Sequence, residues 1–437
     1  MRKAIIVVLL LLIVPVVSAQ PVVDDVIPDP MPLAERPEGD DMSVFLLIGA
    51  GNNSLQEKAG LTDMLMLVAV NRTRGTASML HIPRDYWAFV PGFGMHKINQ
   101  AFYMGETHEV EGGGIEVLRQ TLEYNLGINV DYYAAIDFNG FLGVIDQIGG
   151  VRIPVDCIIQ DYKLKSRELD KRVADNYELF TLPIGVHTLD ADTALWYIRS
   201  RVTSSDLDRG RRTQDILRAV WRKVRSENML TSLPALWDSV SRYLYTDLTL
   251  TDLLGYVPFA LNVDADRIEQ YRFKMGTHIQ NALGPAPDYQ SILAPIDREA
   301  VAELVEDFLT PPTRNQITLA GLRIEVINSG GVNGMATVAA DRLSQEGFSP
   351  TISAESTHYR DFTAIYDFTG QERGSPIPTF QRLFRVTADG VITQPDPNRT
   401  VDYKIYVGNT YSVWACTRNV IQPKWPPEDV ETPTPTP

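Results

Sequence analysis

Three short apolar runs near the start of the chain constrain the fold most strongly. They read SVFLLIGA (43–50), MLMLVAV (64–70) and ASMLHI (77–82). Each run has the length of a strand and is apolar nearly throughout, whereas a strand with one solvated side alternates between apolar and polar residues. We therefore expect these runs to be strands of a sheet that is covered on both faces.

Helical patterns alternate with further strands after these runs. Residues 114–127 are amphipathic and end at a glycine, 128–138 have the pattern of a strand, and 139–150 form a helix that two glycines terminate. This alternation is typical of an α/β domain with helices on both faces of a central sheet. With 437 residues, 44% of them hydrophobic, the chain also has room for a second domain.

A smaller unit follows the Pro-Pro pair at 311–312. It reads as a strand over 322–328, the turn SGGVNG, a helix from Met335 and a strand near 351. This pattern predicts a second α/β or α+β domain that ends near Cys416. The turn lacks the lysine of a P-loop, so we interpret it as a tight turn rather than as a phosphate cradle.

The first 19 residues have the features of an export signal, with retention as a membrane anchor as the alternative. Arg2 and Lys3 precede an apolar stretch and a small-residue cleavage site at 17–19. The stretch is shorter than the roughly 20 residues that span a bilayer, which favours cleavage. In either case we expect an extracytoplasmic protein, secreted or membrane-associated at the cell envelope.

Two further segments have compositions that cannot build a core. Residues 20–42 are rich in proline and acidic residues and predict a linker, and 421–437 predict a disordered tail rich in proline and threonine. The sequence contains two cysteines, Cys157 and Cys416. Outside the cytoplasm they could pair, but their separation leaves a disulfide and two free thiols equally open.

Charge is distributed unevenly along the chain. The formal net charge of −15 argues against nucleic acid or an anionic membrane surface as a general partner. Between 199 and 225, however, nine Arg and Lys residues stand against three Asp residues. Any anion site must therefore be local, and this segment is the strongest candidate.

The basic segment contains a helix whose first turn carries arginines on the face that later becomes apolar. Asp206 is a good N-cap, and arginine in a first turn is unfavourable unless an anion lies near the helix N-terminus. The predicted anion ligands are Arg199, Arg201, Arg209 and Arg212. The alternative is a solvated helix whose arginines pair with Asp206 and Asp208, and charge alone favours this alternative.

A second charged pair ends the third apolar run. In MLHIPRDYW (79–87), Arg84 and Asp85 directly follow a buried strand. Because α/β folds usually bind ligands beside the strand ends, Arg84 can point into a crevice while Asp85 holds it in position. The alternative is an ordinary turn after a strand. His81 is interpreted as a core histidine.

Several motifs together resemble the LytR-CpsA-Psr family. In order they read TDMLMLVAVN…ASMLHIPRD, HKINQAF, GINVDYYAAIDFNGFLGVIDQIGGV, ALWYIRSR and DLDRGRRTQDIL, and they cover about residues 43–226. The unit at 322–415 resembles the small LytR C-terminal domain that is often appended in that family. The resemblance predicts a family domain over 43–310 and the C-terminal domain over 318–416.

The resemblance implies an extracytoplasmic three-layer α/β/α domain that holds a polyprenyl-pyrophosphate-linked glycan in a hydrophobic groove. Family members transfer the phosphoglycan to cell-wall peptidoglycan with the help of a magnesium ion, and they meet the membrane surface through the lipid substrate. Carried over by motif, the pyrophosphate-binding residues are Arg84, Arg199 and Arg201. Asp206 and Arg209 match the polar start of the next helix, and Asp63 matches a metal-associated aspartate. Lys97 is retained as a further predicted pyrophosphate ligand, with a solvated loop lysine as the alternative.

The implied reaction also needs a base. Displacement at phosphorus requires positive charge around the phosphate oxygens and a deprotonated acceptor hydroxyl. The candidate bases are Asp63, Asp85 and Asp206. The residues themselves do not select one of the three.

Three positions depart from the family pattern. Gly51 replaces a carboxylate associated with the metal, Leu61 replaces an arginine, and Thr213 replaces a glutamine. Asp63 is therefore the one matched metal ligand. A weakened binder of polyprenyl phosphate or glycan, and a wall-associated scaffold, are the alternatives to a transferase.

Overall fold

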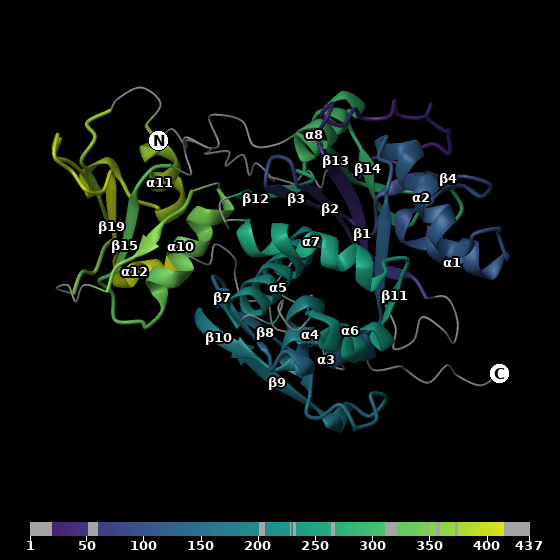
Figure 1. The fold of residues 1–437 in the computed structure, drawn as a ribbon, viewed down its shortest axis with the longest axis horizontal. Coiled ribbons are helices and arrows are strands. Elements are labelled where there is room, and N and C mark those ends of the chain that lie inside the picture. Colours follow the sequence, from purple (N-terminus) through teal and green to yellow (C-terminus); the bar gives the residue numbers. More distant parts are fainter. Residues whose placement is uncertain are drawn as a thin grey trace, which may run out of the picture.

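A six-stranded mixed sheet forms the centre of the larger domain (Figure 1). The computed structural model describes residues 20–414 except 51–59, 201–205, 228, 230–232, 264–266, 311–320, 347, 355–358 and 372–374. In spatial order the strands are β11 (Leu244–Thr246), β6 (Tyr132–Ile136), β1 (Met42–Ala50), β2 (Thr62–Asn71), β3 (Thr76–Ile82) and β12 (Ile268–Arg272). The three apolar runs are β1 to β3, which confirms their prediction as strands of one sheet, and they are neighbours in it.

The strand directions bring several chain segments to one edge of this sheet. Strand β1 is parallel to β6, β3 is parallel to β12, and β2 is antiparallel to both β1 and β3. The carboxyl ends of β1, β3 and β6 therefore lie at the edge where β2 begins. Asp63, at the start of β2, and Arg84, just after β3, meet there.

Helices cover both faces of the sheet, which confirms the predicted α/β class. The first face packs against α1 (Ala101–Thr107), α2 (Gly113–Leu126) and α8 (Arg298–Leu309). The second lies beneath α3 (Phe138–Gln147), α4 (Ala191–Arg199), α5 (Asp206–Ser226), α6 (Leu233–Val240) and α7 (Leu250–Asn262) (Figure 1). In β1 the side chains alternate between buried and half-buried, so its second face is left partly open. A cavity can therefore form under α3 and α5.

Local signals in the sequence fix the ends of these helices. Helix α2 ends at Gly127, which has the left-handed φ of 64° that glycine adopts without strain. Asp137 caps α3, since its carboxylate accepts a hydrogen bond of 2.7 Å from the Gly140 amide. Both helices match the predicted ranges within two or three residues.

Within the described residues, four small two-stranded sheets accompany the central one. They pair β4 (Trp87–Val90) with β5 (Gly94–Lys97), β7 (Val151–Val155) with β10 (Gly185–Leu189), β8 (Ile159–Leu164) with β9 (Tyr177–Leu182), and β13 (Ile279–Leu283) with β14 (Ser291–Pro295). The β4–β5 pair matters for the site, because it follows Arg84 and ends at Lys97.

The segment predicted as a linker lies along the domain. The Val23 amide donates to the Leu283 carbonyl at 2.9 Å, and the Met31 amide donates to the Tyr124 carbonyl at 2.8 Å. Met31 is buried. The many prolines and acidic residues prevent this segment from forming a core of its own, but its backbone is extended and pairs with the neighbouring domain.

The C-terminal domain is a five-stranded sheet with helices on one face. The strand order is β16 (Thr351–Ile352), β15 (Ile324–Asn328), β19 (Tyr403–Val407), β17 (Ala364–Asp367) and β18 (Val391–Thr393). The helices are α10 (Met335–Gln345), α11 (Ile377–Phe384) and α12 (Asn409–Trp414). Their apolar side chains share one core with β15, β17 and β19, so this unit has a hydrophobic core of its own.

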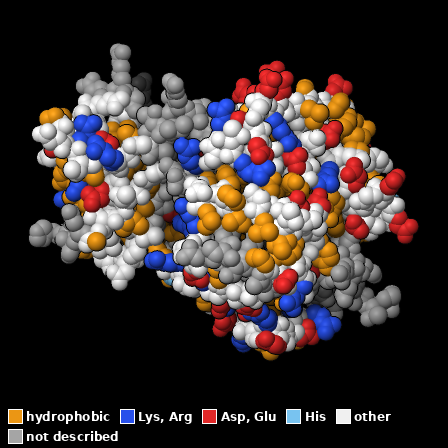
Figure 2. Space-filling model, viewed as in Figure 1, with side chains coloured by type: hydrophobic (Ala, Val, Ile, Leu, Met, Phe, Trp, Pro, Cys, Tyr) orange, Lys and Arg blue, Asp and Glu red, His pale blue; other side chains and the backbone are white. Residues whose placement is uncertain are grey.

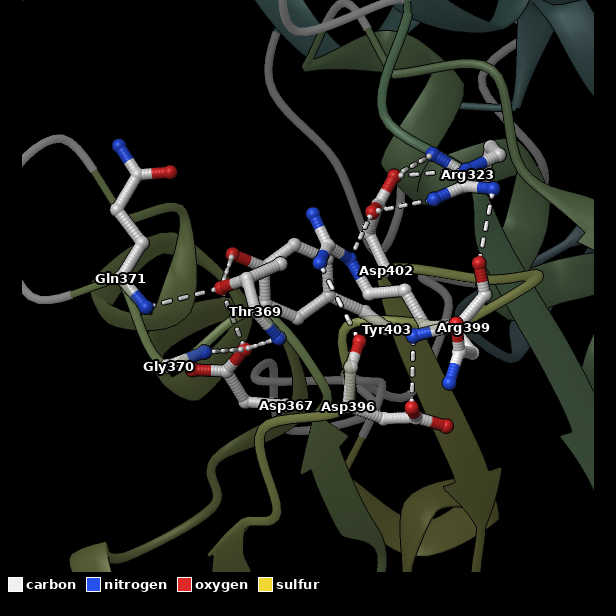
Figure 3. A network of polar contacts seen from close by, with 10 residues as sticks. Arg323, Asp367, Thr369, Gly370, Gln371, Asp396, Arg399, Asp402 and Tyr403 are labelled. Atoms are coloured by element: carbon white, nitrogen blue, oxygen red, sulfur yellow. Dashed lines mark hydrogen bonds and ion pairs between the residues drawn. The ribbon is translucent and has the colours of Figure 1, made fainter.

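A polar network fastens the start of β15 to the start of β19 (Figure 3). Asp402 accepts hydrogen bonds from Arg323 Nη2 at 2.9 Å and from Arg399 Nε at 2.7 Å. These two guanidinium groups hold the pKa of the Asp402 carboxyl far below its usual range. On the neighbouring strand Asp367 accepts from the Thr369 hydroxyl at 2.7 Å. The network is internal to the domain.

Helix α10 joins the two domains. Val186, on β10, packs against the C-terminal core, and a methyl group at Gly334 would lie 3.1 Å from it. Arg222, on α5, lies 3.7 Å from Asp341, on α10. The C-terminal domain thus contacts the helix that carries Arg209.

The predicted export signal and the predicted disordered tail lie outside the described residues. Residues 1–19 and 421–437 lie outside them, and no helix within the described part of the chain is both long and apolar enough to cross a membrane. Cys157 is disulfide-bonded. Cys416, the second cysteine of the sequence, lies outside the described residues.

Candidate functional site

A cavity of about 180 Å³ lies between the sheet edge and helices α3, α4 and α5. Its apolar wall consists of Ala50, Met64, Ile136, Phe138, Phe141, Val144, Ile145, Leu195, Ile198, Ile216, Leu217 and Val220. Its polar lining consists of Asp63, His81, Arg84, Asp137, Arg199, Arg209 and Thr213. Along α5 the lining changes from Arg209 to Val220, a rise of about 16 Å along the helix axis. The cavity therefore fits a ligand with an anionic group at one end and an apolar remainder.

Arg84 is fixed by carboxylates on both sides. Its Nη1 donates a 2.7 Å hydrogen bond to Asp63 Oδ1, and its Nε lies 3.6 Å from Asp85 Oδ2. Lys97 Nζ in turn lies 3.0 Å from Asp85 Oδ1. Of these residues, Asp63 and Arg84 line the cavity. Asp85 and Lys97 are not among the lining residues, so Lys97, predicted as a pyrophosphate ligand, contacts Arg84 through Asp85.

The backbone around Arg84 is also held. Its carbonyl accepts a hydrogen bond from the Asn99 amide at 3.2 Å, and the Asp85 carbonyl accepts from the Leu293 amide at 2.8 Å. A loop with these bonds on consecutive residues keeps the guanidinium preorganised at the end of β3.

Two further arginines reach the same cavity from different helices. Arg199 ends α4, and its guanidinium carbon lies 4.3 Å from the centre of the Phe138 ring. Arg209 belongs to the first turn of α5 and is largely buried. The structure thus brings together Arg84, Arg199 and Arg209, which are up to 125 residues apart in sequence. Three guanidinium groups around one apolar-walled cavity make a site for a phosphate-type anion.

Arg212 has a different position from the one predicted. It is buried away from the cavity, and its guanidinium donates to the carbonyls of Tyr197 and Ser200. On α5, Arg212 lies about 60° around the helix axis from Arg209, at the margin of the side that lines the cavity. Its side chain therefore points toward the end of α4. Its contacts therefore favour a structural role, joining α4 to α5, over the predicted contact with substrate.

Two predicted site residues cannot be placed. Arg201 lies outside the described residues. Asp206, predicted as the N-cap, is the first residue of α5, and its side chain lies outside the described part of the structure. Asp63 and Asp85 are thus the candidate bases with described side chains, and Asp63 is the one of these two that lines the cavity.

The cavity contains two polar residues, His81 and Asp137, that the sequence analysis did not assign to the site. His81 lines it, and a methyl group at Gly210 would lie only 2.3 Å from His81 Nδ1, so α5 approaches β3 closely because position 210 has no side chain. Asp137, the cap of α3, lines it as well. Asp137 directly follows the strand in the segment GINVDYYAAIDF. Its position at a strand end could have indicated it as a site residue.

A metal site formed by protein ligands alone is not evident. Among the described residues, no three His, Cys, Asp or Glu side chains lie close enough together to hold an ion. Asp63 and Asp137 are the carboxylates that line the cavity, and each already accepts a hydrogen bond. Magnesium often takes one or two protein carboxylates and completes its shell with phosphate oxygens and water, so the cavity fits magnesium together with a phosphate ligand.

Fold and site together define an α/β protein with a cavity beside the carboxyl ends of its strands, lined by arginines and by apolar side chains. Residues 23–293 match the LytR_cpsA_psr family, and residues 321–411 match the family described as LytR cell envelope-related transcriptional attenuator. The first match spans more than half of the chain. The protein belongs to the LytR_cpsA_psr family.

Individual relatives share this part of the chain. The polyisoprenyl-teichoic acid–peptidoglycan teichoic acid transferase TagT of Bacillus subtilis is 33% identical over 235 residues, which are 52% of this chain and 66% of TagT. The regulatory protein MsrR of Staphylococcus aureus (strain COL) is 29% identical over 213 residues, 48% of this chain and 58% of MsrR. The chain thus matches less than two thirds of the length of either relative.

A solved structure has the same fold. The crystal structure of Bacillus subtilis TagV covers 62% of this chain and 98% of TagV, with a TM-score of 0.50 and 22% sequence identity. At this identity the likeness establishes the fold of the larger domain.

Proposed function

We propose that this protein transfers a phosphoglycan from a polyprenyl-pyrophosphate carrier to a cell-wall acceptor such as peptidoglycan. The observation that carries the proposal is the cavity whose wall is apolar and whose sheet-edge end holds Arg84, Arg199 and Arg209. A prenyl chain fits the apolar wall, and a pyrophosphate fits the three guanidinium groups. The name of TagT, a teichoic acid transferase, supports the same reaction class.

The proposed reaction is a displacement at phosphorus. The oxygen of an acceptor hydroxyl bonds to the phosphorus that carries the glycan, the bond from that phosphorus to the bridging oxygen breaks, and polyprenyl phosphate leaves. The hydroxyl proton passes to a carboxylate. Arg84, Arg199 and Arg209 neutralise the charge on the phosphate oxygens, and this electrostatic stabilisation is the main requirement of phosphoryl transfer.

Asp63 is the proposed base and the proposed metal ligand. It lines the cavity, and one of its oxygens is bonded to Arg84, which leaves Asp63 Oδ2 to face a hydroxyl or an ion. Asp85 is ion-paired with both Lys97 and Arg84, so it is better suited to positioning Arg84. Asp206 stays an alternative base because its side chain is outside the described residues.

Magnesium is a proposed cofactor that binds together with the lipid. Once bound, it would stabilise negative charge on the phosphate oxygens. Asp63 alone would hold it weakly, and the pyrophosphate would supply further oxygens, so binding of metal and lipid is cooperative. Calorimetry should detect no magnesium binding by lipid-free protein and clear binding with polyprenyl pyrophosphate present. Tight binding by lipid-free protein would contradict this, and Gly51→Asp should increase the lipid-free affinity.

The proposed location is the outer side of the cytoplasmic membrane, where the lipid substrate is available. Helix α7 supports contact with that membrane. It is mostly apolar, yet none of its residues is fully buried, and Figure 2 shows hydrophobic side chains exposed along it. Its Ala260 carbonyl accepts a hydrogen bond from Trp221 of α5, the helix that lines the cavity. An exposed apolar surface beside a lipid cavity suits a bilayer.

Turnover tests the proposal and separates it from its alternatives. Purified protein is incubated with a lipid-linked phosphoglycan and peptidoglycan, and released polyprenyl phosphate is measured by mass spectrometry. We expect one polyprenyl phosphate for each glycan transferred. Lipid binding without turnover would instead identify a binding protein, and neither binding nor turnover would identify a scaffold.

A further inference from the structure

The sheet of the C-terminal domain has one face that no described helix covers. Helices α10, α11 and α12 pack on the opposite face, where Ile365 and Ile405 belong to the core. Helix α10 also contacts β7 and β10 of the larger domain. The uncovered face therefore points away from the larger domain (Figure 1).

Aromatic rings gather on the uncovered face. Tyr366 and Tyr406 stand on neighbouring strands with ring centres 5.2 Å apart, and the Phe368 ring centre lies 6.4 Å from that of Tyr366. All three side chains are half-buried. The antiparallel pairing of β17 with β19 places Tyr366 opposite Lys404 and Ala364 opposite Tyr406, so the rings share one side of the sheet.

Arg360 extends this cluster toward the edge of the sheet. Its guanidinium carbon lies 5.0 Å from the Tyr406 ring centre and 5.9 Å from that of Tyr366. Its backbone is fixed, because its amide donates to the Ser329 carbonyl at 2.7 Å and its carbonyl accepts from the Asn409 amide at 2.9 Å. The flat guanidinium is thus preorganised beside two rings.

The same loop presents two more rings to solvent. Tyr359 is 60% exposed and Phe362 is 64% exposed, the largest exposures among the aromatic residues of the described chain. Rings that exposed contribute little to the hydrophobic core. Tyr359 and Phe362 lie one and two positions from Arg360 in the chain. We call these two residues, together with Arg360, Tyr366 and Tyr406, the aromatic face.

The charges on the aromatic face are balanced. Lys404 is ion-paired with Glu325 at 2.9 Å, and Asp361 accepts a hydrogen bond from Tyr359 next to Arg360. The face therefore differs from the cavity, which carries three arginines. Because the whole chain has a net charge of −15, a face without excess positive charge does not suit a polyphosphate chain. It suits a polymer with an uncharged backbone.

We propose that the aromatic face binds the sugar backbone of peptidoglycan strands. A sugar ring has C–H groups on its flat faces, which pack on aromatic rings, and hydroxyl and amide groups on its rim, which bond to Arg360 and the tyrosine hydroxyls. This inference rests on the proposed function. It adds that acceptor and donor are bound by separate domains, the acceptor strand by the C-terminal domain and the donor lipid by the cavity.

Binding to purified sacculi tests the inference. Sacculi are stripped of phosphate-linked polymers by acid and of proteins by protease, and the full chain is titrated against them. The double variant Tyr359→Ala, Phe362→Ala should bind roughly tenfold more weakly, because each exposed ring contributes a modest stacking energy. Tyr103→Ala is the matched control, since Tyr103 is exposed on α1 of the other domain. Its binding should equal that of the parent.

Three results would overturn the inference. The double variant could bind stripped sacculi as tightly as the parent does. The chain could bind only sacculi that were not treated with protease, which would identify a wall protein as the partner. Binding could require the phosphate-linked polymers that the acid removes. Affinity for polyprenyl pyrophosphate, measured on the same variant, should be unchanged, so a failure of this inference is distinguishable from a failure of the proposed transfer.

Discussion

Arg84 and Asp63 form a 2.7 Å ion pair across the ends of two neighbouring strands, and both residues line the cavity. The pair places a positive charge where the phosphates of the donor would lie and leaves one carboxylate oxygen beside it. The relationship connects the charged end of the MLHIPRDYW segment to the proposed chemistry. It also makes the role of Arg84 testable.

Replacing Arg84 by alanine should reduce turnover by about 10²–10³-fold, the effect of losing one preorganised charge stabiliser. Arg84→Lys should recover part of the loss, because lysine restores the charge but not the two-pronged geometry of the guanidinium. The measurement is polyprenyl phosphate release at saturating lipid. If Arg84→Ala has normal turnover, Arg84 only holds the strand ends together.

Arg212→Met should destabilise the protein by about 3 kcal/mol, since two buried carbonyls would each lose a hydrogen bond. Turnover, measured where the variant is still folded, should stay within about threefold of the parent, because this arginine does not line the cavity. Thermal unfolding and turnover are compared on the same preparation. An unchanged melting temperature with a hundredfold loss of turnover would contradict the structural role and support the predicted contact of Arg212 with substrate.

The close contact between Gly210 and His81 gives a third prediction. Alanine at 210 would place its methyl group 2.3–2.5 Å from the ring of a buried histidine, so α5 must shift. Overpacking of this kind costs about 1–3 kcal/mol. Gly210→Ala should therefore lower both the melting temperature and the affinity for pyrophosphate lipid. Adding His81→Ala should restore much of the melting temperature, and a double variant less stable than Gly210→Ala would show that α5 is not held by this contact.

Asp215 should make stability depend on pH. Burial raises the pKa of its carboxyl to about 7, although Arg211 opposes the shift. The charged groups that face it are Arg211, Arg218, Asp156 and Asp341 of the C-terminal domain. Because the folded state holds this proton more tightly than the unfolded chain does, its contribution to stability is complete below about pH 4 and is lost as the pH rises toward 7.

Asp215→Asn cannot titrate and serves as the comparison. Between pH 4.5 and pH 7.5, the melting temperature of the parent should fall relative to that of the variant. Circular dichroism melts at four or five pH values are sufficient. Parallel curves for the two proteins would show that Asp215 has the same pKa in the folded and unfolded states.

The sequence predicted the sheet well because its signals are local. The apolar runs became β1 to β3, and Gly127 ended its helix at the predicted residue. The convergence of Arg84, Arg199 and Arg209 was predicted from the family motifs rather than from local patterns. These residues are distant in sequence, and in the structure they line one cavity at the edge of the sheet.

Other features depend on tertiary contacts that a single sequence does not contain. Arg212 is three residues from Arg209 on the same helix, yet its guanidinium donates a hydrogen bond to the Ser200 carbonyl at the end of α4. His81 has the pattern of a core residue within its strand, and in the structure it is buried close to Gly210 and lines the cavity. The aromatic face arises because the pairing of β17 with β19 brings Tyr366 next to Tyr406, 40 positions later in the chain.

The most direct test of the account is a crystal structure of the protein with a polyprenyl pyrophosphate. The account predicts the prenyl chain against Phe141, Ile145 and Val220, and phosphate oxygens within hydrogen-bond distance of at least two of Arg84, Arg199 and Arg209. Lipid bound elsewhere with this cavity empty, or phosphates that contact none of the three arginines, would contradict it.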